Sequence, residues 1–172
     1  MPTIKMEDYM NNKRLWSMAV LLVFLGFPAS ASMVSFLLVE TGLDKEGPST
    51  QYTSLWEGGI MDPFFDAGYI ITNSPIVRAD EKPTQDLSGH AEEGFYDALM
   101  GGADYFIVGF LEYQIQSKKA VPVGMVLKIY RTDTKKMVYE HNFTVGAGKS
   151  LDEEFKIAKN AGRTMLSHMK DR

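Results

Sequence analysis

The chain has 172 residues and no cysteine, and 18 basic against 22 acidic residues give it a net charge of −4. Without cysteine there can be no disulfide, thiolate metal site, thiol nucleophile or lipid carried on an N-terminal cysteine. The negative charge argues against non-specific binding to nucleic acid or to anionic membranes, because proteins that bind this way present a basic face.

Residues 1–31 have the three parts of a secretory signal peptide. Lys13 and Arg14 precede the apolar run Leu15–Phe27, and an A-x-A pattern places the cleavage after Ala31. The alternative is a retained anchor, because the uncharged stretch Leu15–Val39 is long enough to span a bilayer. Pro28 and the small residues after it interrupt that stretch, so we favour cleavage. Translation could start at Met1 or at Met10.

Residues 32–172 are predicted to form one α/β domain in the periplasm, with a net charge of −5. Its first strand is expected at Met33–Glu40, a short and almost continuous apolar run. Apolar residues at helical spacing then begin at Tyr52. Pro63 is expected to start a second short helix that ends at Gly68, because proline suits the first helical position. Tyr69–Val77 is predicted to contain the second strand, which ends around Pro75.

The remaining elements follow a polar loop, Arg78–Ser88. Ala91, Phe95 and Ala98 mark one face of a helix that ends at Gly101. Three strands are then expected, at Asp104–Gln116, Val121–Arg131 and Lys136–Val145, the last two forming a hairpin. The clearest element is the last helix, whose apolar residues recur every three or four positions: Leu151, Phe155, Ala158, Gly162, Met165 and Met169.

The predicted order is therefore β-α-β-α-β-β-β-α. It indicates a mixed sheet of about five strands packed by three helices, with parallel pairs early in the chain and antiparallel pairs late. Most of the large aromatic residues fall on helix faces or in apolar strands and are expected in the core: Trp56, Phe64, Phe65, Phe95, Tyr105 and Phe106.

The stretch Val145–Ser150 (VGAGKS) invites comparison with a phosphate-binding loop. Such a loop needs G-x-x-x-x-G-K-[ST], and the first glycine would have to stand where Phe143 does. Ser150 and Glu153 instead form the S-x-x-E pattern of a capping box. We therefore predict a helix cap and no nucleotide.

No other pattern predicts catalysis, a cofactor or a metal. His90, His141 and His168 lack the spacing of metal ligands, and there is no G-x-S-x-G motif for a serine nucleophile. The acidic pairs and triplets lie in first turns of predicted helices, where they stabilise the helix dipole. We therefore predict a protein without catalytic, cofactor-binding or metal-binding residues.

One group of residues is a candidate for partner binding. Tyr113, Tyr130 and Tyr139 lie on the late alternating strands with Lys128 and Arg131, and they could form an exposed aromatic and basic surface for protein contact. The alternative is that these tyrosines only stabilise the sheet through cross-strand pairs.

The segment Gly102–Gly109 (GADYFIVG) after a helix resembles the envelope proteins related to the curli secretion channel. These share a fold with the penicillin-binding-protein activator lipoproteins and with the amino-terminal domain of the TolB translocation protein, an anticodon-binding-like α/β fold. Leu127–Tyr139 is similar to their hairpin, and Gly68–Ile71 to the start of their second strand. The resemblance implies a non-catalytic periplasmic domain that binds other envelope proteins. The missing lipid-bearing cysteine and missing membrane hairpins depart from those relatives.

The expected function is thus an exported accessory protein that binds an envelope protein in assembly, transport or cell-wall synthesis. Strand addition at a sheet edge or docking on the tyrosine surface would serve this purpose. We expect no nucleic acid and no stable membrane insertion after signal cleavage. The rival expectation is a small-molecule binder or enzyme with a cleft near Arg78–Ser88. A self-associating homo-oligomer is the third.

Overall fold

The computed structural model describes residues 31–44, 50–80, 83, 87–148 and 150–169, which belong to one compact unit that begins at Ala31. The predicted signal peptide lies almost wholly outside these residues. No helix in the described part of the chain is long and apolar enough to cross a membrane.

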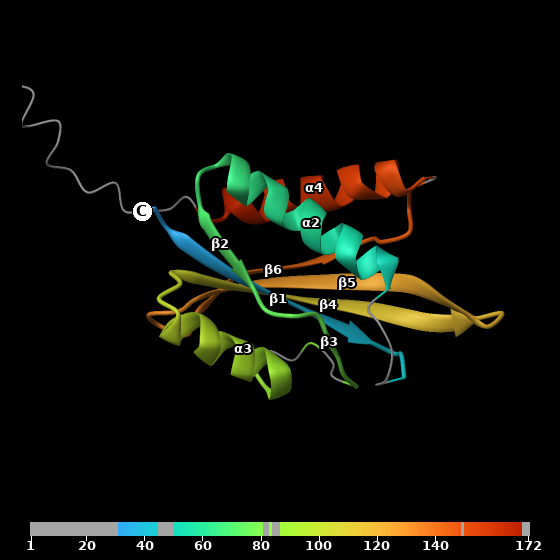
Figure 1. The fold of residues 1–172 in the computed structure, drawn as a ribbon, viewed down its shortest axis with the longest axis horizontal. Coiled ribbons are helices and arrows are strands. Elements are labelled where there is room, and N and C mark those ends of the chain that lie inside the picture. The colour runs from blue at the N-terminus through green and yellow to red at the C-terminus, as the bar shows by residue number, and fades with distance from the viewer. Residues whose placement is uncertain (1–30, 45–49, 81–82, 84–86, 149, 170–172) are drawn as a thin grey trace, which may run out of the picture. The chain divides into compact units, whose positions relative to one another are not determined.

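The fold is a mixed α/β arrangement, as the sequence predicts, built on one six-stranded sheet (Figure 1). The strands are β1 (Met33–Thr41), β2 (Ile70–Asn73), β3 (Val77–Arg78), β4 (Tyr105–Gln116), β5 (Lys119–Arg131) and β6 (Met137–Phe143). They lie in the order β2-β1-β4-β5-β6, and β3 also pairs with β1. Pairs with β1 are parallel, whereas β4–β5 and β5–β6 are antiparallel.

Helices cover the two faces of the sheet unequally. α2 (Gln51–Asp66) and α4 (Leu151–Ser167) pack together over one face, around Trp56, Ile60, Ile107 and Met165. α3 (Gly89–Met100) lies on the other face and packs against β1 and β4 through Phe95 and Phe106 (Figure 1). We call the first the closed face and the second the α3 face.

Glycines let α2 and α4 approach closely on the closed face. A Cβ atom on Gly162 would lie 2.3 Å from the carbonyl oxygen of Ile60, and one on Gly59 would lie 2.5 Å from the Cβ of Ala158. Contacts that short would force the helices apart. The two glycines therefore set the distance between these helices.

The predicted helix break at Pro63 is wrong, because α2 continues through the proline to Asp66. A proline inside a helix costs roughly 3 kcal/mol. Pro63 and Phe64 are both buried, and Phe64 packs edge-on against Phe36 of β1. This burial holds the last turn in place. Phe65 was expected in the core but is 75% exposed.

Two strands also differ from expectation. The segment Tyr69–Val77, predicted to contain one strand, is divided into β2 and β3, with Pro75 between them. Proline cannot donate a ladder hydrogen bond, which explains the interruption. β5 starts at Lys119 instead of Val121, so only Ser117 and Lys118 connect it to β4, and the hairpin is longer than expected.

Candidate functional site: a groove on the open half of the sheet

The Gly-Lys-Ser stretch builds a cradle for a carboxylate of the same chain. The backbone N–H groups of Gly146 and Gly148 donate to Glu154, at 2.8 and 3.0 Å. Trp56 Nε1 donates to the same carboxylate at 2.9 Å, and Glu154 is fully buried. Ser150 caps α4 by accepting from the N–H of Glu153, as the capping box predicts. Two N–H groups that a phosphate-binding loop would turn toward a phosphate, those of Gly146 and Gly148, thus bind a side chain of the same chain.

A second buried carboxylate is also satisfied from within. Arg78 donates to one oxygen of Glu40 through Nε (3.0 Å) and a terminal guanidinium nitrogen (2.8 Å). The N–H of Thr50, the cap of α2, donates to the other at 2.7 Å. Burial pushes the pKa of Glu40 up, but hydrogen bonds from Thr53, Thr50 and Arg78 outweigh it, so this pKa lies below its ordinary value.

Tyr113 belongs to the same polar cluster. Its hydroxyl lies within hydrogen-bond distance of the side-chain oxygens of Thr50 and Thr53. Burial raises the pKa of Tyr113, so the hydroxyl stays protonated at neutral pH. Because every member has a partner inside the cluster, we assign Glu40, Arg78 and Tyr113 a structural role at the carboxyl end of β1.

The expected tyrosine surface does not exist. Tyr113 is 2% exposed on the closed face, whereas Tyr130 is 3% exposed and packs against Phe95 of α3 on the opposite face. Tyr139 is half-buried and stacks on His168, with ring centres 3.7 Å apart. Alternation along neighbouring strands separates these side chains. The three tyrosines therefore cannot form one docking surface.

The basic residues expected beside the tyrosines are likewise engaged. Lys128 is 2% exposed, and its Nζ lies 3.3 Å from a carboxylate oxygen of Glu140 on β6. Arg131 is half-buried and pairs with Asp133 in the β5–β6 turn, at 2.6 Å. Sequence periodicity does not reveal the Lys128–Glu140 pair, because it depends on the register of β5 and β6, whereas Arg131 and Asp133 are neighbours within the turn.

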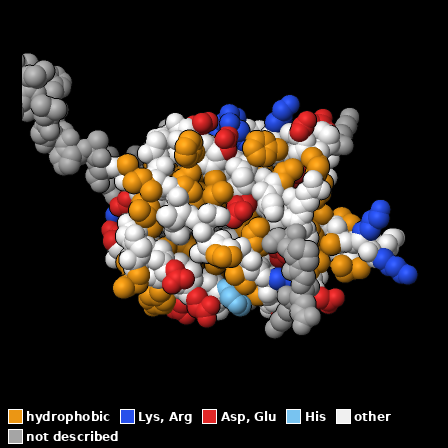
Figure 2. Space-filling model, viewed as in Figure 1, with side chains coloured by type: hydrophobic (Ala, Val, Ile, Leu, Met, Phe, Trp, Pro, Cys, Tyr) orange, Lys and Arg blue, Asp and Glu red, His pale blue; other side chains and the backbone are white. Residues whose placement is uncertain are grey.

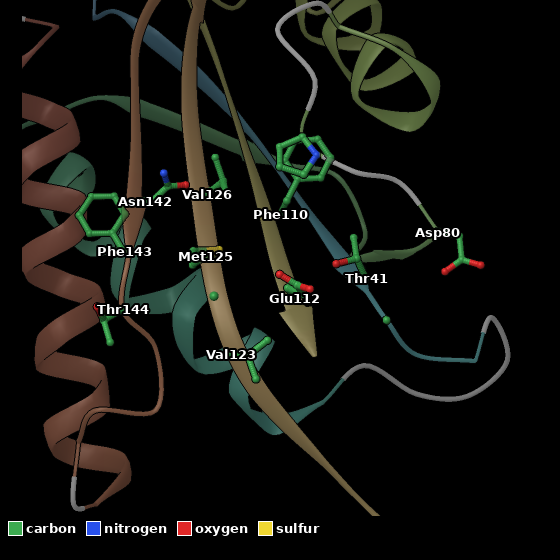
Figure 3. A pocket seen from close by; sticks show the side chains of 13 residues that line it. Thr41, Asp80, Phe110, Glu112, Val123, Met125, Val126, Asn142, Phe143 and Thr144 are labelled. Atoms are coloured by element: carbon green, nitrogen blue, oxygen red, sulfur yellow. The ribbon is translucent and has the colours of Figure 1, made fainter. Parts of the chain in front are cut away.

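A hollow of about 820 Å³ lies on the part of the α3 face that no helix of the described residues covers. Phe110, Val126 and Asn142 are cross-strand neighbours on β4, β5 and β6, so they share this face. We call the hollow the groove; its lining is Thr41, Gly42, Asp80, Pro83, Phe110, Glu112, Val123, Gly124, Met125, Val126, Asn142, Phe143 and Thr144 (Figure 3).

The lining of the groove combines apolar side chains with negative charge. Val123 and Val126 supply the accessible apolar surface, with Phe110 6% exposed beside them, and the two charged lining residues, Asp80 and Glu112, are both acidic and exposed. Figure 3 shows Glu112 on β4 between the Asp80 loop and β6. No lysine, arginine or histidine is among the described lining residues. The groove therefore suits a ligand with an apolar body and a positive charge.

The groove extends to the polar loop Arg78–Ser88, through Asp80 and Pro83. The sequence analysis gave a small-molecule cleft near this loop as the rival expectation. Residues 81–82 and 84–86 of the loop lie outside the described part of the chain. Sequence reasoning missed Glu112 and Asp80 themselves. In the sequence, Glu112 cannot be told apart from any other exposed residue of an alternating strand. It becomes part of a site only because no described helix covers this part of the sheet.

Two of the three histidines, His141 and His168, make packing contacts. His168 stacks on Tyr139, and His141 lies between Tyr139 and Phe143. Among the residues that the structure describes, no group of three or more histidines, aspartates or glutamates is arranged to hold a metal ion.

The order and pairing of the elements define a mixed α/β fold of the class expected from the sequence. No family model matches the chain, and neither does any curated protein. A PelC dodecamer from Paraburkholderia phytofirmans is similar over 83% of this chain and 92% of its own, at 14% identity and TM-score 0.49. TolB from Acinetobacter baumannii is similar over 83% of this chain and 29% of its own, at 9% and 0.44. Lipoprotein GNA1162 from Neisseria meningitidis is similar over 78% and 98%, at 14% and 0.39. At these identities the similarity concerns the fold alone.

Proposed function

We propose that this chain is an exported, non-catalytic accessory protein of the cell envelope that binds a polypeptide segment in the groove. The observation that carries the proposal is the uncovered part of the α3 face, where an acidic and apolar hollow of about 820 Å³ lies beside the edge strand β6. The buried carboxylates Glu40 and Glu154 are enclosed in structural networks, so they are not available for chemistry.

The expected ligand is a segment with apolar residues next to lysine or arginine. Its apolar side chains would cover Phe110 and Val126, while its cation would approach Glu112 and Asp80. Complementary charge of this kind speeds encounter and selects partners more than it adds affinity. An extended segment could also pair with the backbone of β6, which is the mode expected from the sequence.

Photo-crosslinking in cells tests this function. A photo-reactive amino acid at Asn142, in the groove, should join the protein to a partner, whereas one at the exposed Lys156 of α4 should not. Capture should be lost in the Asp80→Asn/Glu112→Gln variant, which keeps the shape of the groove but removes its charge. Equal capture from both positions, or capture that survives the charge removal, would contradict the proposal.

A second function is favoured by the size of the groove. Its volume falls within the range of roughly 300–1,000 Å³ typical of small-molecule sites. A cationic organic molecule would then replace the peptide segment. A thermal-shift screen of such molecules distinguishes the two: a stabilising compound whose effect depends on Glu112 favours the small ligand, and no such compound favours the polypeptide.

A further inference from the structure

The β4–β5 hairpin extends past the helices (Figure 1), and Lys118 and Lys119 give its tip a positive charge. Its last four pairs run from Tyr113–Pro122 to Gln116–Lys119, beyond the bulge at Glu112/Tyr113. We call residues 113–122 the arm. Lys118 and Lys119 are exposed at its tip and form no ion pair with any residue that the structure describes.

The turn at the tip is strained. Ser117 and Lys118 have φ of 50° and 65°, the left-handed conformations of a two-residue hairpin turn. Asn-Gly is the usual sequence there, and a residue with a Cβ costs about 1–2 kcal/mol more in this region. Lys118 is therefore unfavourable for the conformation of the turn. We take this as a sign that its side chain has a role outside the turn.

Apolar side chains lie next to the lysines. Ile115 is 63% exposed on the arm and pairs across the hairpin with Ala120. The space-filling view shows hydrophobic and basic side chains together on the projecting end of the molecule (Figure 2). The arm thus has the two properties expected of a ligand for the groove, an apolar surface and an adjacent positive charge.

We propose that the groove receives the arm of a second copy of this chain. The inference rests on the proposed function and names the occupant of the same groove. Lys118 and Lys119 would approach Glu112 and Asp80, and Ile115 would contact Phe110 and Val126. The two surfaces are complementary in charge within one sequence, so no other component is needed.

A copy cannot fill its own groove with its own arm. Glu112 lies at the base of the arm, and Gln116 is four residues further along β4, roughly 13 Å at strand rise. Continuous pairing with β5 keeps the tip pointing away. The contact is therefore between different surfaces of two copies, a geometry that produces closed rings or open chains instead of isolated symmetric dimers.

Charge reversal tests the inference on the purified protein. The Lys118→Glu/Lys119→Glu variant has an acidic arm and acidic groove, and the Asp80→Lys/Glu112→Lys variant has a basic arm and basic groove. Each alone should associate at least about tenfold more weakly than wild type, because like charges meet at the contact. Mixed together, the two should assemble again, since each arm then meets a groove of opposite charge.

Light-scattering mass over a concentration series is the readout, with Lys156→Glu on α4 as a control for charge alone and circular dichroism as a control for folding. A monomeric wild type, unchanged association of the folded variants or failure of the mixture to assemble would overturn the inference. If groove-dependent photo-crosslinking to another protein persists in that case, the proposed function stands and only the identity of the occupant is wrong. If that crosslinking is also absent, both are wrong.

Discussion

The two faces of the sheet are built for different tasks. On the closed face, α2 and α4 exclude water from a continuous core, and even a carboxylate, Glu154, is buried there with three donors. On the α3 face the described residues provide one helix, which covers only part of β1 and β4, and the uncovered parts of β4, β5 and β6 line an acidic groove. Residues of the closed face should therefore determine stability, and residues of the groove should determine binding.

The largest effect is expected from Glu154→Ala on the closed face. Removing the carboxylate leaves the N–H groups of Trp56, Gly146 and Gly148 without their acceptor, and each such loss costs about 1–3 kcal/mol when the group stays buried. The free energy of unfolding, measured with urea, should fall by at least about 3 kcal/mol. Asp152→Ala, an exposed acid in the same first turn, should cost less than about 1 kcal/mol. An equal decrease in the free energy of unfolding for the two variants would show that the hydrogen bonds to Glu154 do not stabilise the fold.

Next comes Gly162→Ala on α4. Alanine normally stabilises a helix relative to glycine by about 0.5–1 kcal/mol. Here its Cβ would lie 2.3 Å from the backbone of Ile60, so the free energy of unfolding should instead fall by about 1–3 kcal/mol. Gly58→Ala on α2 is the matched control, because its Cβ would meet only Phe155 at 3.9 Å and should stabilise. Stabilisation by both would mean that the helices are not in close contact.

A smaller, pH-dependent effect is expected at Glu40. Its pKa in the folded protein is lowered, so its contribution to stability is complete above the ordinary value of 4.5 and is lost as the pH falls through the folded pKa. Glu40→Gln should reduce the free energy of unfolding by about 1–3 kcal/mol at pH 7. The difference from wild type should shrink on acidification. A constant difference down to pH 3 would contradict this assignment.

The smallest effect on stability is expected in the groove. Glu112→Gln should change the free energy of unfolding by less than about 0.5 kcal/mol, because the side chain is exposed and neutral glutamine is close to it in size. Association should nevertheless weaken measurably. A large loss of stability would show that Glu112 supports the fold and would remove the contrast between the two faces.

Local patterns predict most of this fold. The last helix, the capping box at Ser150 and the apolar run of β1 are each set by nearby residues, and the structure confirms them. Leu151 and Phe155, predicted on the apolar face of that helix, are however 41% and 37% exposed. The continuation of α2 through Pro63 could not be predicted, because burial of Phe64 against β1 decides it. The early start of β5 was missed because Lys119 and Ala120 carry no strand signal of their own.

The site is harder to predict than the fold. Alternation places Tyr113 and Tyr130 correctly in strands, but it does not show that helices cover both faces above them. The groove exists because α3 covers only part of β1 and β4 and no described helix covers the rest of that face. Its acids come from segments about thirty residues apart, Asp80 and Glu112, which only the sheet topology brings together.

Disulfide trapping tests the central claim most directly, since the chain has no cysteine of its own. One tagged copy would carry Lys119→Cys at the arm tip and another Val126→Cys in the groove, with Lys156→Cys on α4 as the alternative partner. We predict that the 119–126 disulfide between copies forms rapidly under mild oxidation and that the 119–156 disulfide does not. Equal disulfide formation at positions 126 and 156, or none at position 126, would contradict the assignment of the groove as the binding surface.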